Sequence, residues 1–288
     1  MTDIKQISPQ GQKWLSRLTA IAKPPKSLRY KGILPDDAPT VAIVGSRKPT
    51  LYGKGVTLKL AAELAARGVI IVSGLALGHD ALAHRGALDG GGITIGVLGN
   101  GLNKIYPSSN QSLASEILAS SGAIISEFAP DFPVYKQNFL QRNRLISGLA
   151  DVVIVVEAAT RSGSLNTAMH ALEQNKELMA VPGNITSPLS AGTNRLIAQG
   201  AAPVLSVDDV LEKLGIKANK KSRRSKSAPV GGSPAQNLIL KLLKNGVSDG
   251  DELIVQSGLS ASDYNQALTM LEIDGLVRPL GANQWAIK

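Results

Sequence analysis

Six short apolar runs alternate with helical patterns between residues 40 and 183, and this alternation limits the fold more than any other feature of the chain. The runs read TVAIV, VIIV, ITIGVL, AIIS, DVVIVV and LMAVPG. Strands that alternate with helices form βαβ units, which build a parallel sheet through right-handed crossovers. The β-branched run at residues 151–156 is typical of a strand that is covered on both faces. The sequence therefore predicts an α/β fold.

A basic stretch divides the 288 residues into two parts. We expect a short N-terminal lead-in over residues 1–38 and a sheet domain over 39–216. Residues 217–233 hold six Lys or Arg and no acidic residue, which is typical of a flexible, solvated linker. Residues 234–288 have the pattern of a winged helix-turn-helix, with a two-stranded wing after the last helix. Outside the sheet domain, helices are expected at residues 14–21, 237–243, 252–256 and 260–273.

Composition excludes several kinds of site. There is no cysteine, which excludes disulfides, thiolate nucleophiles and cysteine-bound zinc. The three histidines lack the spacing of a metal site. Gly99 and Gly101 lack the third glycine of a dinucleotide fingerprint, because residue 104 is Lys, and no P-loop motif occurs. We therefore expect no cofactor, no metal and no catalytic residue.

The N-terminus lacks the apolar core of a signal peptide, and no apolar run approaches the roughly 20 residues of a membrane helix. We expect a soluble, cytoplasmic protein with no membrane partner. The formal net charge is +9, but the basic stretch supplies much of it. Charge alone is therefore weak evidence for a nucleic-acid partner.

Glycine and serine follow several of the predicted strands. Because parallel strands end at one edge of the sheet, these turns should point backbone N–H groups at a ligand held there. We predict anion-binding turns at Gly45, at Ser73-Gly74, and at Ser162-Gly163-Ser164 before a helix.

A cationic segment with one aromatic residue precedes the run at residues 151–156. In a helix that begins at Lys136, the side chains of Lys136, Phe139 and Asn143 share one face. A base can stack on an aromatic ring while cations bind the phosphates, as in single-stranded DNA sites. The alternative is that Phe139 belongs to the core and that Arg142 and Arg144 are solvated.

Two other polar features have structural alternatives. Asp80 and His84 lie on one helix face, either as a polar pair that faces the ligand or as a helix-start carboxylate and its neighbour. Glu157 ends a buried strand and is either an acid/base group or the acceptor of a backbone N–H or an arginine. We favour the structural interpretation for all three residues.

Several motifs occur together in one order along residues 21–214. They are AIVGSR (42–47), SGLALGHDALAH (73–84), VLGNGLNKIYPSSN (97–110), QRNRLISGLAD (141–151) and AVPGNITSPLSAGTNRLIAQGA (180–201). The chain therefore resembles the DprA/Smf family, the DNA-processing proteins of natural transformation. The resemblance implies an extended Rossmann-like domain with a small winged-helix domain.

The resemblance also implies a function. The family binds single-stranded DNA, loads the RecA recombinase onto it during recombination, and dimerises through the Rossmann-like domain. Carried over by motif, the DNA-binding residues would be Ser46, Arg47, Lys136, Phe139, Arg142, Asn143 and Arg144. The surface for the second copy or RecA would include Asn194, Leu196 and Ile197. The chain departs from the family pattern at Leu140, where proline is common, and at His79, where isoleucine is usual.

Two rival functions come from other classes. Rossmann-like nucleotide phosphoribohydrolases use a PGGxGTxxE pattern, but the corresponding run here is EAATRSGSLNTAM, without the double glycine or the glutamate. A transcription factor that binds through the winged helix is disfavoured, because residues 234–288 hold four Lys or Arg against six Asp or Glu. We expect a sequence-independent, non-enzymatic DNA-binding protein.

Overall fold

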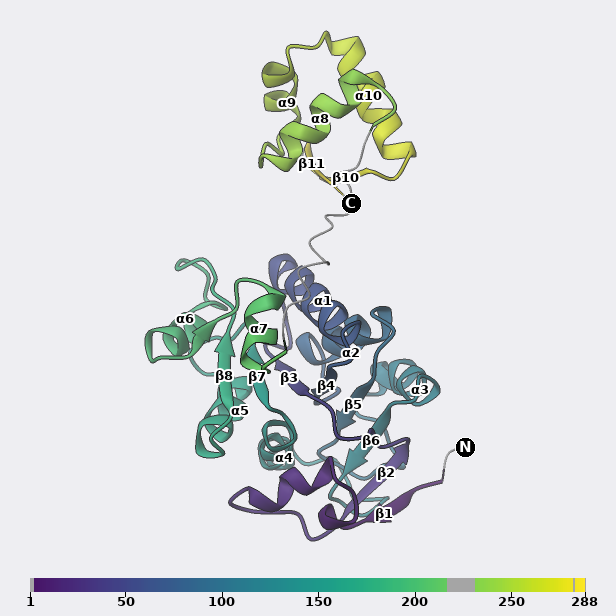
Figure 1. The fold of residues 1–288 in the computed structure, drawn as a ribbon, viewed down its shortest axis with the longest axis vertical. Coiled ribbons are helices and arrows are strands. Elements are labelled where there is room, and N and C mark those ends of the chain that lie inside the picture. The colour runs from purple at the N-terminus through teal and green to yellow at the C-terminus, as the bar shows by residue number, and fades with distance from the viewer. Residues whose placement is uncertain (1–2, 217–230, 282, 288) are drawn as a thin grey trace. The chain divides into compact units, whose positions relative to one another are not determined.

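The computed structural model describes residues 3–216, 231–281 and 283–287. The chain forms two compact units, Met1–Ala218 and Asn219–Lys288 (Figure 1). The basic stretch predicted as a linker falls mostly outside the described residues. None of the helices in the described ranges is long and apolar enough to cross a membrane.

The first unit contains a nine-stranded sheet in the order β1-β2-β6-β5-β4-β3-β7-β8-β9. All six predicted strands are present, and they pair in parallel with β9 at the end. They are β3 (Thr40–Val44), β4 (Ile70–Ser73), β5 (Thr94–Val97), β6 (Ala123–Ser126), β7 (Val152–Val155) and β8 (Glu177–Ala180), and β9 is Ala202–Pro203. The prediction of a Rossmann-like α/β fold with a winged-helix domain is confirmed.

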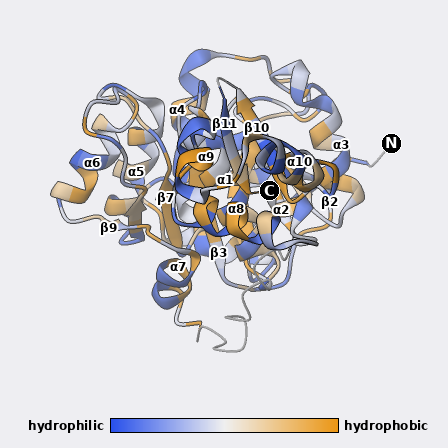
Figure 2. Cartoon of the chain, turned by 90° about the horizontal axis from the view of Figure 1, so that it is seen from above, coloured by the Kyte–Doolittle hydropathy of each residue, from blue (hydrophilic) through white to orange (hydrophobic). Residues whose placement is uncertain are grey.

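Helices cover both faces of the sheet because the side chains of each strand alternate between two cores. Val153 and Val155 of β7 pack with α4 and α5, whereas Val152 and Ile154 pack with α1, α2 and α7. The helices carry hydrophilic and hydrophobic residues in alternation, as one-sided burial requires (Figure 2). Their bounds are α1 (Leu51–Ala65), α2 (His79–Asp89), α3 (Gln111–Ala119), α4 (Lys136–Leu149), α5 (Gly163–Glu173), α6 (Ala191–Ala198) and α7 (Val207–Lys213).

Strands β3 and β7 are neighbours although three strands separate them in the order of the chain. From β3 the chain continues outward through β4, β5 and β6, and it then returns to lay β7 on the opposite side of β3. This reversal is the topological switch point of a doubly wound sheet, and the crevice at the carboxyl ends of such strands is where these folds bind ligands.

The N-terminal segment differs from the prediction in two ways. It adds two antiparallel strands to the sheet edge at β6, namely β1 (Lys5–Ile7) and β2 (Leu28–Gly32). The helix predicted at residues 14–21 is instead a short 3-10 helix, Leu15–Ala20, and another 3-10 helix, Pro9–Gly11, precedes it. These strands were not predicted, because they are short and only partly buried and so lack an apolar pattern.

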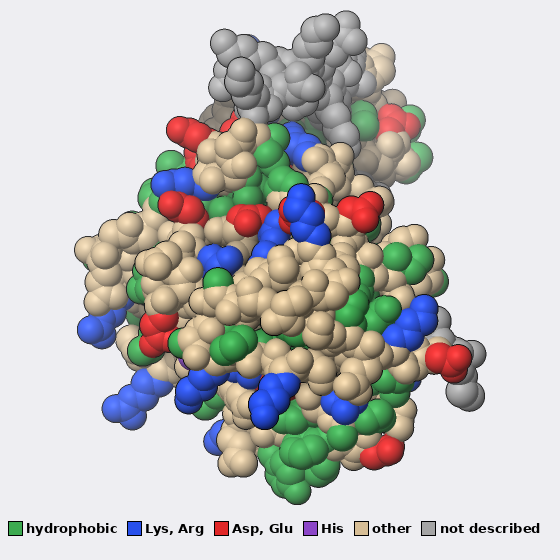
Figure 3. Space-filling model, turned by 60° about the horizontal axis from the view of Figure 1, so that its bottom comes forward, with side chains coloured by type: hydrophobic (Ala, Val, Ile, Leu, Met, Phe, Trp, Pro, Cys, Tyr) green, Lys and Arg blue, Asp and Glu red, His purple; other side chains and the backbone are tan. Residues whose placement is uncertain are grey.

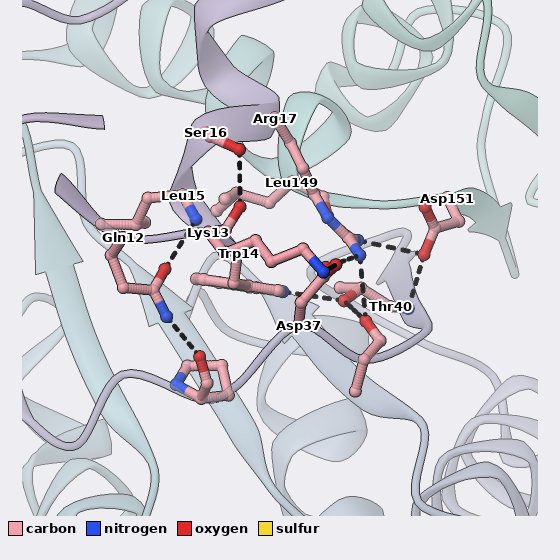
Figure 4. A network of polar contacts seen from close by, with 12 residues as sticks. Gln12, Lys13, Trp14, Leu15, Ser16, Arg17, Asp37, Thr40, Leu149 and Asp151 are labelled. Carbon is pink, nitrogen blue, oxygen red and sulfur yellow. Dashed lines mark hydrogen bonds and ion pairs between the residues drawn. The ribbon is translucent and has the colours of Figure 1, made fainter. Parts of the chain in front are cut away.

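Buried and charged contacts fix this segment against the start of the sheet. Trp14 is fully buried, and its indole Nε1–H donates to Oγ1 of Thr40 at 2.9 Å. Arg17 lies 2.7 Å from Asp37 and 3.0 Å from Asp151, which precedes β7 (Figure 4). The segment is therefore an integral part of the large unit.

The second unit has the winged-helix architecture. It consists of α8 (Pro234–Lys244), α9 (Gly250–Ser257), α10 (Ala261–Ile273) and the wing strands β10 (Val277–Gly281) and β11 (Gln284–Ile287). Its core includes Ile239, Leu253, Leu271 and Val277. Ser260 caps α10, because its side chain accepts from the backbone N–H of Asp263 at 3.1 Å.

Candidate nucleic-acid site

A cavity of about 840 Å³ lies at the carboxyl ends of β3 and β7. Its wall is built from the turn after β3, the first half of α4, and the turn before α5. It brings together most of the predicted site residues. Those that line it are Gly45, Ser46, Arg47, Lys136, Phe139, Arg142, Asn143, Ser162, Gly163 and Ser164.

The turn that carries Arg47 is held from below by Glu157. The backbone carbonyl of Glu157 accepts the N–H of Ser46 at 2.8 Å. Its carboxylate accepts the backbone N–H of Thr50 at 2.9 Å and the Thr50 hydroxyl at 2.5 Å. Glu157 is almost fully buried and does not line the cavity. It therefore fixes the turn, in line with the structural interpretation.

His79 completes this buried network. Its Nε2 lies 3.0 Å from the Glu157 carboxylate and its Nδ1 lies 2.6 Å from the Thr57 hydroxyl. Burial lowers the pKa of His79, although the neighbouring Glu157 opposes the shift. A neutral ring that donates from Nε2 to the Glu157 carboxylate can accept the Thr57 hydroxyl at Nδ1, and that single proton is then not given to the carbonyl of Gly53, which lies 2.8 Å from the same hydroxyl. A side chain at Gly45 would collide with the ring, at 2.5 Å from Cδ2.

Lys136 and Phe139 stand on the first turn of α4 and line the cavity. Lys136 is exposed and Phe139 is half-buried. The Phe139 ring packs against Tyr106, with 5.6 Å between ring centroids. The guanidinium carbon of Arg47 lies 5.7 Å from the Phe139 centroid, which is within the range of a cation–π contact. The Phe139 side chain is therefore partly buried by its neighbours and partly accessible to solvent.

Arg142 forms the floor of the cavity. Only 3% of the residue is exposed, and its Nη1 donates to the carbonyl of Val97 at 2.6 Å. Burial lowers the pKa of Arg142 to about 10, the nearby Asp80 opposes that shift, and Arg47 adds to it. With a pKa near 10 the guanidinium stays charged at neutral pH. The alternative in which Phe139 belongs to the core also predicted that Arg142 is solvated. That prediction is wrong, because Arg142 is buried.

The predicted anion site at Ser73-Gly74 is already filled by the chain itself. The Asp80 carboxylate accepts the backbone N–H of Gly74 at 3.1 Å, and the Ser73 hydroxyl donates to the carbonyl of Ile43 at 2.7 Å. A Cβ on Gly74 would lie 1.9 Å from Nη1 of Arg142. This turn does not line the cavity. We correct the prediction: the turn binds an internal carboxylate and leaves room for Arg142.

Two further residues of α4 have structural partners. Arg144 does not line the cavity, because its Nη2 pairs with Glu127 at 2.5 Å. It is buried rather than solvated, and we correct its placement beside the DNA-binding residues. The Asn143 amide lines the cavity and donates to the carbonyl of Gly163 at 3.3 Å and to Asn166 at 3.2 Å. Asn143 therefore positions the turn that begins α5.

That turn presents small polar groups to the cavity. Ser162 caps α5, because its Oγ accepts the backbone N–H of Ser164 at 3.3 Å. Arg161 and Tyr106 are among the lining residues that sequence reasoning missed. Arg161 directly precedes the predicted anion turn, so its position was a usable signal. Tyr106 lies in an irregular loop, where no periodicity indicates which way a side chain points.

The cavity is positively charged. Among its described lining residues, the cations are Arg47, Lys136, Arg142 and Arg161, and the only carboxylate is Asp80. On the face of the molecule in Figure 3, Lys and Arg side chains are scattered over the lower part with few Asp or Glu side chains between them. The concentration of cations in a cavity with an aromatic wall favours a phosphate-bearing, base-bearing ligand.

The other predicted polar groups lie elsewhere. His84 is fully buried with Nδ1 2.7 Å from the Thr94 hydroxyl, and burial lowers its pKa to about 3. On α6, the Asn194 amide makes hydrogen bonds with both the N–H and the carbonyl of Gly183, and Leu196 packs against the core. Ile197 is half-buried. None of these residues lines the cavity.

A family model described as "DNA recombination-mediator protein A" matches residues 5–215, and one described as "DprA winged helix domain" matches residues 223–283. The chain belongs to the DprA family. The first match spans the whole sheet and every cavity residue, which confirms the resemblance recognised from the motifs.

Characterised relatives agree with this assignment. Protein Smf of Escherichia coli is 50% identical over 174 residues, which cover 60% of this chain and 46% of that protein. The DNA processing protein DprA of Bacillus subtilis is 43% identical over 199 residues, which cover 68% of this chain and 67% of that protein. The matched region thus spans about half to two thirds of the length of these DprA-family relatives.

Two solved DprA structures share the fold. The protein from Streptococcus pneumoniae superposes with a TM-score of 0.66 at 38% identity, covering 73% of this chain and 74% of that one. The protein from Helicobacter pylori superposes with a TM-score of 0.64 at 36% identity, covering 74% of this chain and 98% of that one, and its structure is described as revealing a unique single-stranded DNA binding mode.

Proposed function

We propose that this chain binds single-stranded DNA without sequence preference, in the cavity at the switch point of the sheet. The observation that carries the proposal is the grouping of Arg47 and Lys136, two exposed cations, with the partly exposed side chain of Phe139 in one cavity. The cations would bind phosphates and the ring would stack a base, and neither contact distinguishes one base from another.

The described DprA relatives support this proposal. The Helicobacter pylori protein is described as binding single-stranded DNA, and it shares 36% identity over 74% of this chain. Ser46 and the turn at residues 162–164 would add polar and backbone donors for phosphate oxygens. Arg142, which forms the floor of the cavity, would add positive charge to the site without being exposed to solvent.

Hydrolysis of a nucleotide is disfavoured by the same geometry. Asp80, the one carboxylate among the described lining residues, already accepts the amides of Gly74 and Ala76. Glu157 is bonded to Thr50 and His79. A general base must lie within hydrogen-bond reach of the proton that it removes from the substrate or water. Both carboxylates are instead engaged in hydrogen bonds that fix the fold. A nucleoside-monophosphate hydrolysis assay should therefore detect no turnover above the buffer blank.

We further propose that the chain forms a homodimer and loads RecA onto the bound strand, with α6 as part of the surface. The support is sequence kinship and an exposed apolar residue: Ile185, which is 91% exposed, lies in the loop that Asn194 holds through Gly183. Ile197 would extend this surface, whereas Leu196 is engaged with the core. Sedimentation of wild type against Ile185→Glu tests the dimer, and RecA filament assembly on coated DNA tests the loading.

The primary experiment is a binding titration with single-stranded and double-stranded oligonucleotides across a range of salt concentrations. Arg47→Ala and Lys136→Ala should each weaken single-strand binding for every sequence. Each should also reduce the salt slope by about 0.7, the value for one phosphate contact on a single strand. A preference above about 1–3 kcal/mol for one base at one position would contradict sequence independence.

A further inference from the structure

A second group of aromatic rings lies outside the cavity, in the loop that leads into α4. The chain has only ten aromatic residues, and three of them, Phe128, Phe132 and Tyr135, make this group, which we call the aromatic ledge. Phe128 and Phe132 are stacked with 4.8 Å between ring centroids. Tyr135 meets the edge of Phe132 at 5.9 Å. Tyr135 is the outermost ring and is 50% exposed.

Backbone hydrogen bonds hold the ledge in place. The carbonyl of Phe132 accepts the N–H of Gly101 at 2.9 Å, and the carbonyl of Pro130 accepts the N–H of Asn103 at 3.0 Å. These bonds tie the ledge to the loop that delivers Tyr106 to the cavity wall. The Tyr135 ring is therefore presented on a supported loop, and a ring that is already ordered loses little conformational entropy when a ligand stacks on it.

The ledge continues directly from the cavity. Val134 and Lys136, the chain neighbours of Tyr135, both line the cavity, and Phe139 follows one helical turn later. Along the chain, Lys136 thus stands between two aromatic residues, Tyr135 outside the cavity and Phe139 inside it. This alternation of rings and a cation is what a single strand needs to extend beyond one bound nucleotide.

Charge around the ledge also suits a polyanion. Lys104 is exposed on the loop beside the ledge, and Lys136 is exposed on the first turn of α4. Of the acidic side chains of the ledge loop, Glu127 pairs with Arg144, whereas Asp131 is exposed and keeps its charge although it accepts from the neutral amide of Asn103 at 2.6 Å. The two lysines therefore outnumber the one exposed carboxylate, Asp131, around the ledge.

We propose that Tyr135 is a second base platform, which stacks a nucleotide next to the one held at Phe139, with Phe132 as its support. The proposal rests on the proposed single-strand binding and assigns it a direction: the strand leaves the cavity past Lys136 and over the aromatic ledge. A strand too short to leave the cavity does not reach Tyr135.

The test measures the affinity of the full chain for oligothymidylates of increasing length, with wild type, Tyr135→Ala, Tyr135→Phe and Phe139→Ala. Tyr135→Ala should weaken binding of long strands by about 5- to 150-fold, which corresponds to one stacked base, with an unchanged salt slope. Its affinity for the shortest strands that bind measurably should equal that of wild type. Tyr135→Phe keeps the ring and should bind as wild type.

Tyr52→Ala is the matched control, because Tyr52 is similarly exposed but lies outside the cavity on α1. If Tyr135→Ala binds long strands as Tyr52→Ala does, while Phe139→Ala is impaired, the second platform is refuted and the cavity stands. If Phe139→Ala also binds as wild type, single-strand binding in the cavity is itself refuted. Thermal unfolding of each variant checks that a loss of affinity does not reflect unfolding.

Discussion

Replacing Phe139 with alanine distinguishes a ring that stacks a base from a ring that belongs to the core, because the two roles predict different losses of folding stability and of DNA affinity. A fully buried phenylalanine costs about 3–5 kcal/mol of stability when it is truncated to alanine. Because the Phe139 side chain is only partly buried, against Tyr106, we expect a loss below that range, under about 3 kcal/mol. Loss of the contact with Arg47 contributes about 0.5–1 kcal/mol within this total.

The effect of the same substitution on DNA binding is distinct. One base stacked on an aromatic ring contributes about 1–3 kcal/mol, so Phe139→Ala should raise the dissociation constant by about 5- to 150-fold. The salt slope should stay unchanged, since no phosphate contact is removed. Fluorescence anisotropy with a labelled oligothymidylate measures both quantities, and urea unfolding of the free protein measures the stability.

A second substitution serves as the control. Phe139→Leu keeps most of the apolar volume and should lose little stability, yet it should bind DNA almost as weakly as Phe139→Ala. The reasoning is wrong if Phe139→Ala unfolds with the full loss of a core phenylalanine and Phe139→Leu binds DNA as wild type. In that case the ring only supports the cavity wall.

Three further outcomes are expected. Glu157→Ala leaves the donors of Thr50 and His79 without an acceptor and should destabilise the protein by about 3 kcal/mol or more in urea unfolding, whereas Glu157→Gln, which keeps one carbonyl, should cost less. Burial lowers the pKa of His84 to about 3, so the unfolded chain binds more protons below its ordinary pKa of 6.5, and stability should fall as pH decreases from 6.5 towards 3. His84→Leu should make this fall shallower, and equal slopes in the two proteins would exclude His84 as a source. Deletion of residues 217–288 should leave single-strand binding at low salt largely intact, and loss of binding there would place the site elsewhere.

The strands of the parallel sheet were predictable because a strand that is buried on both faces appears in the sequence as a continuous apolar run. Residues 152–156 are apolar and β-branched without interruption, and β7 is covered by helices on both sides. The two N-terminal strands have no such apolar run. β1 reads KQI and β2 reads LRYKG, and both are mostly exposed or half-exposed at the sheet edge, so their side chains show no apolar period.

The candidate site was predictable only as far as its motifs reach. Arg47, Lys136 and Phe139 follow from the family pattern, and the structure gathers them in one cavity. Arg142 and Arg144 stand on the same helix within one motif, and the sequence does not distinguish them. Their placement depends on distant partners, since the carbonyl of Val97 accepts from Arg142 and the carboxylate of Glu127 pairs with Arg144.

The turn at Gly74 explains why small residues after a strand are an ambiguous signal. A glycine at the start of a helical segment exposes backbone donors and permits close approach, and both properties suit an external anion. Here the donors serve Asp80, and the space above the glycine holds the guanidinium of Arg142. The same local sequence therefore places a buried cation under the cavity instead of leaving an open anion site. Because a buried charge is screened less than an exposed one, Arg142 would raise the positive potential felt by a phosphate held at Arg47 and Lys136 in the proposed site, to the extent that the nearby Asp80 does not offset it.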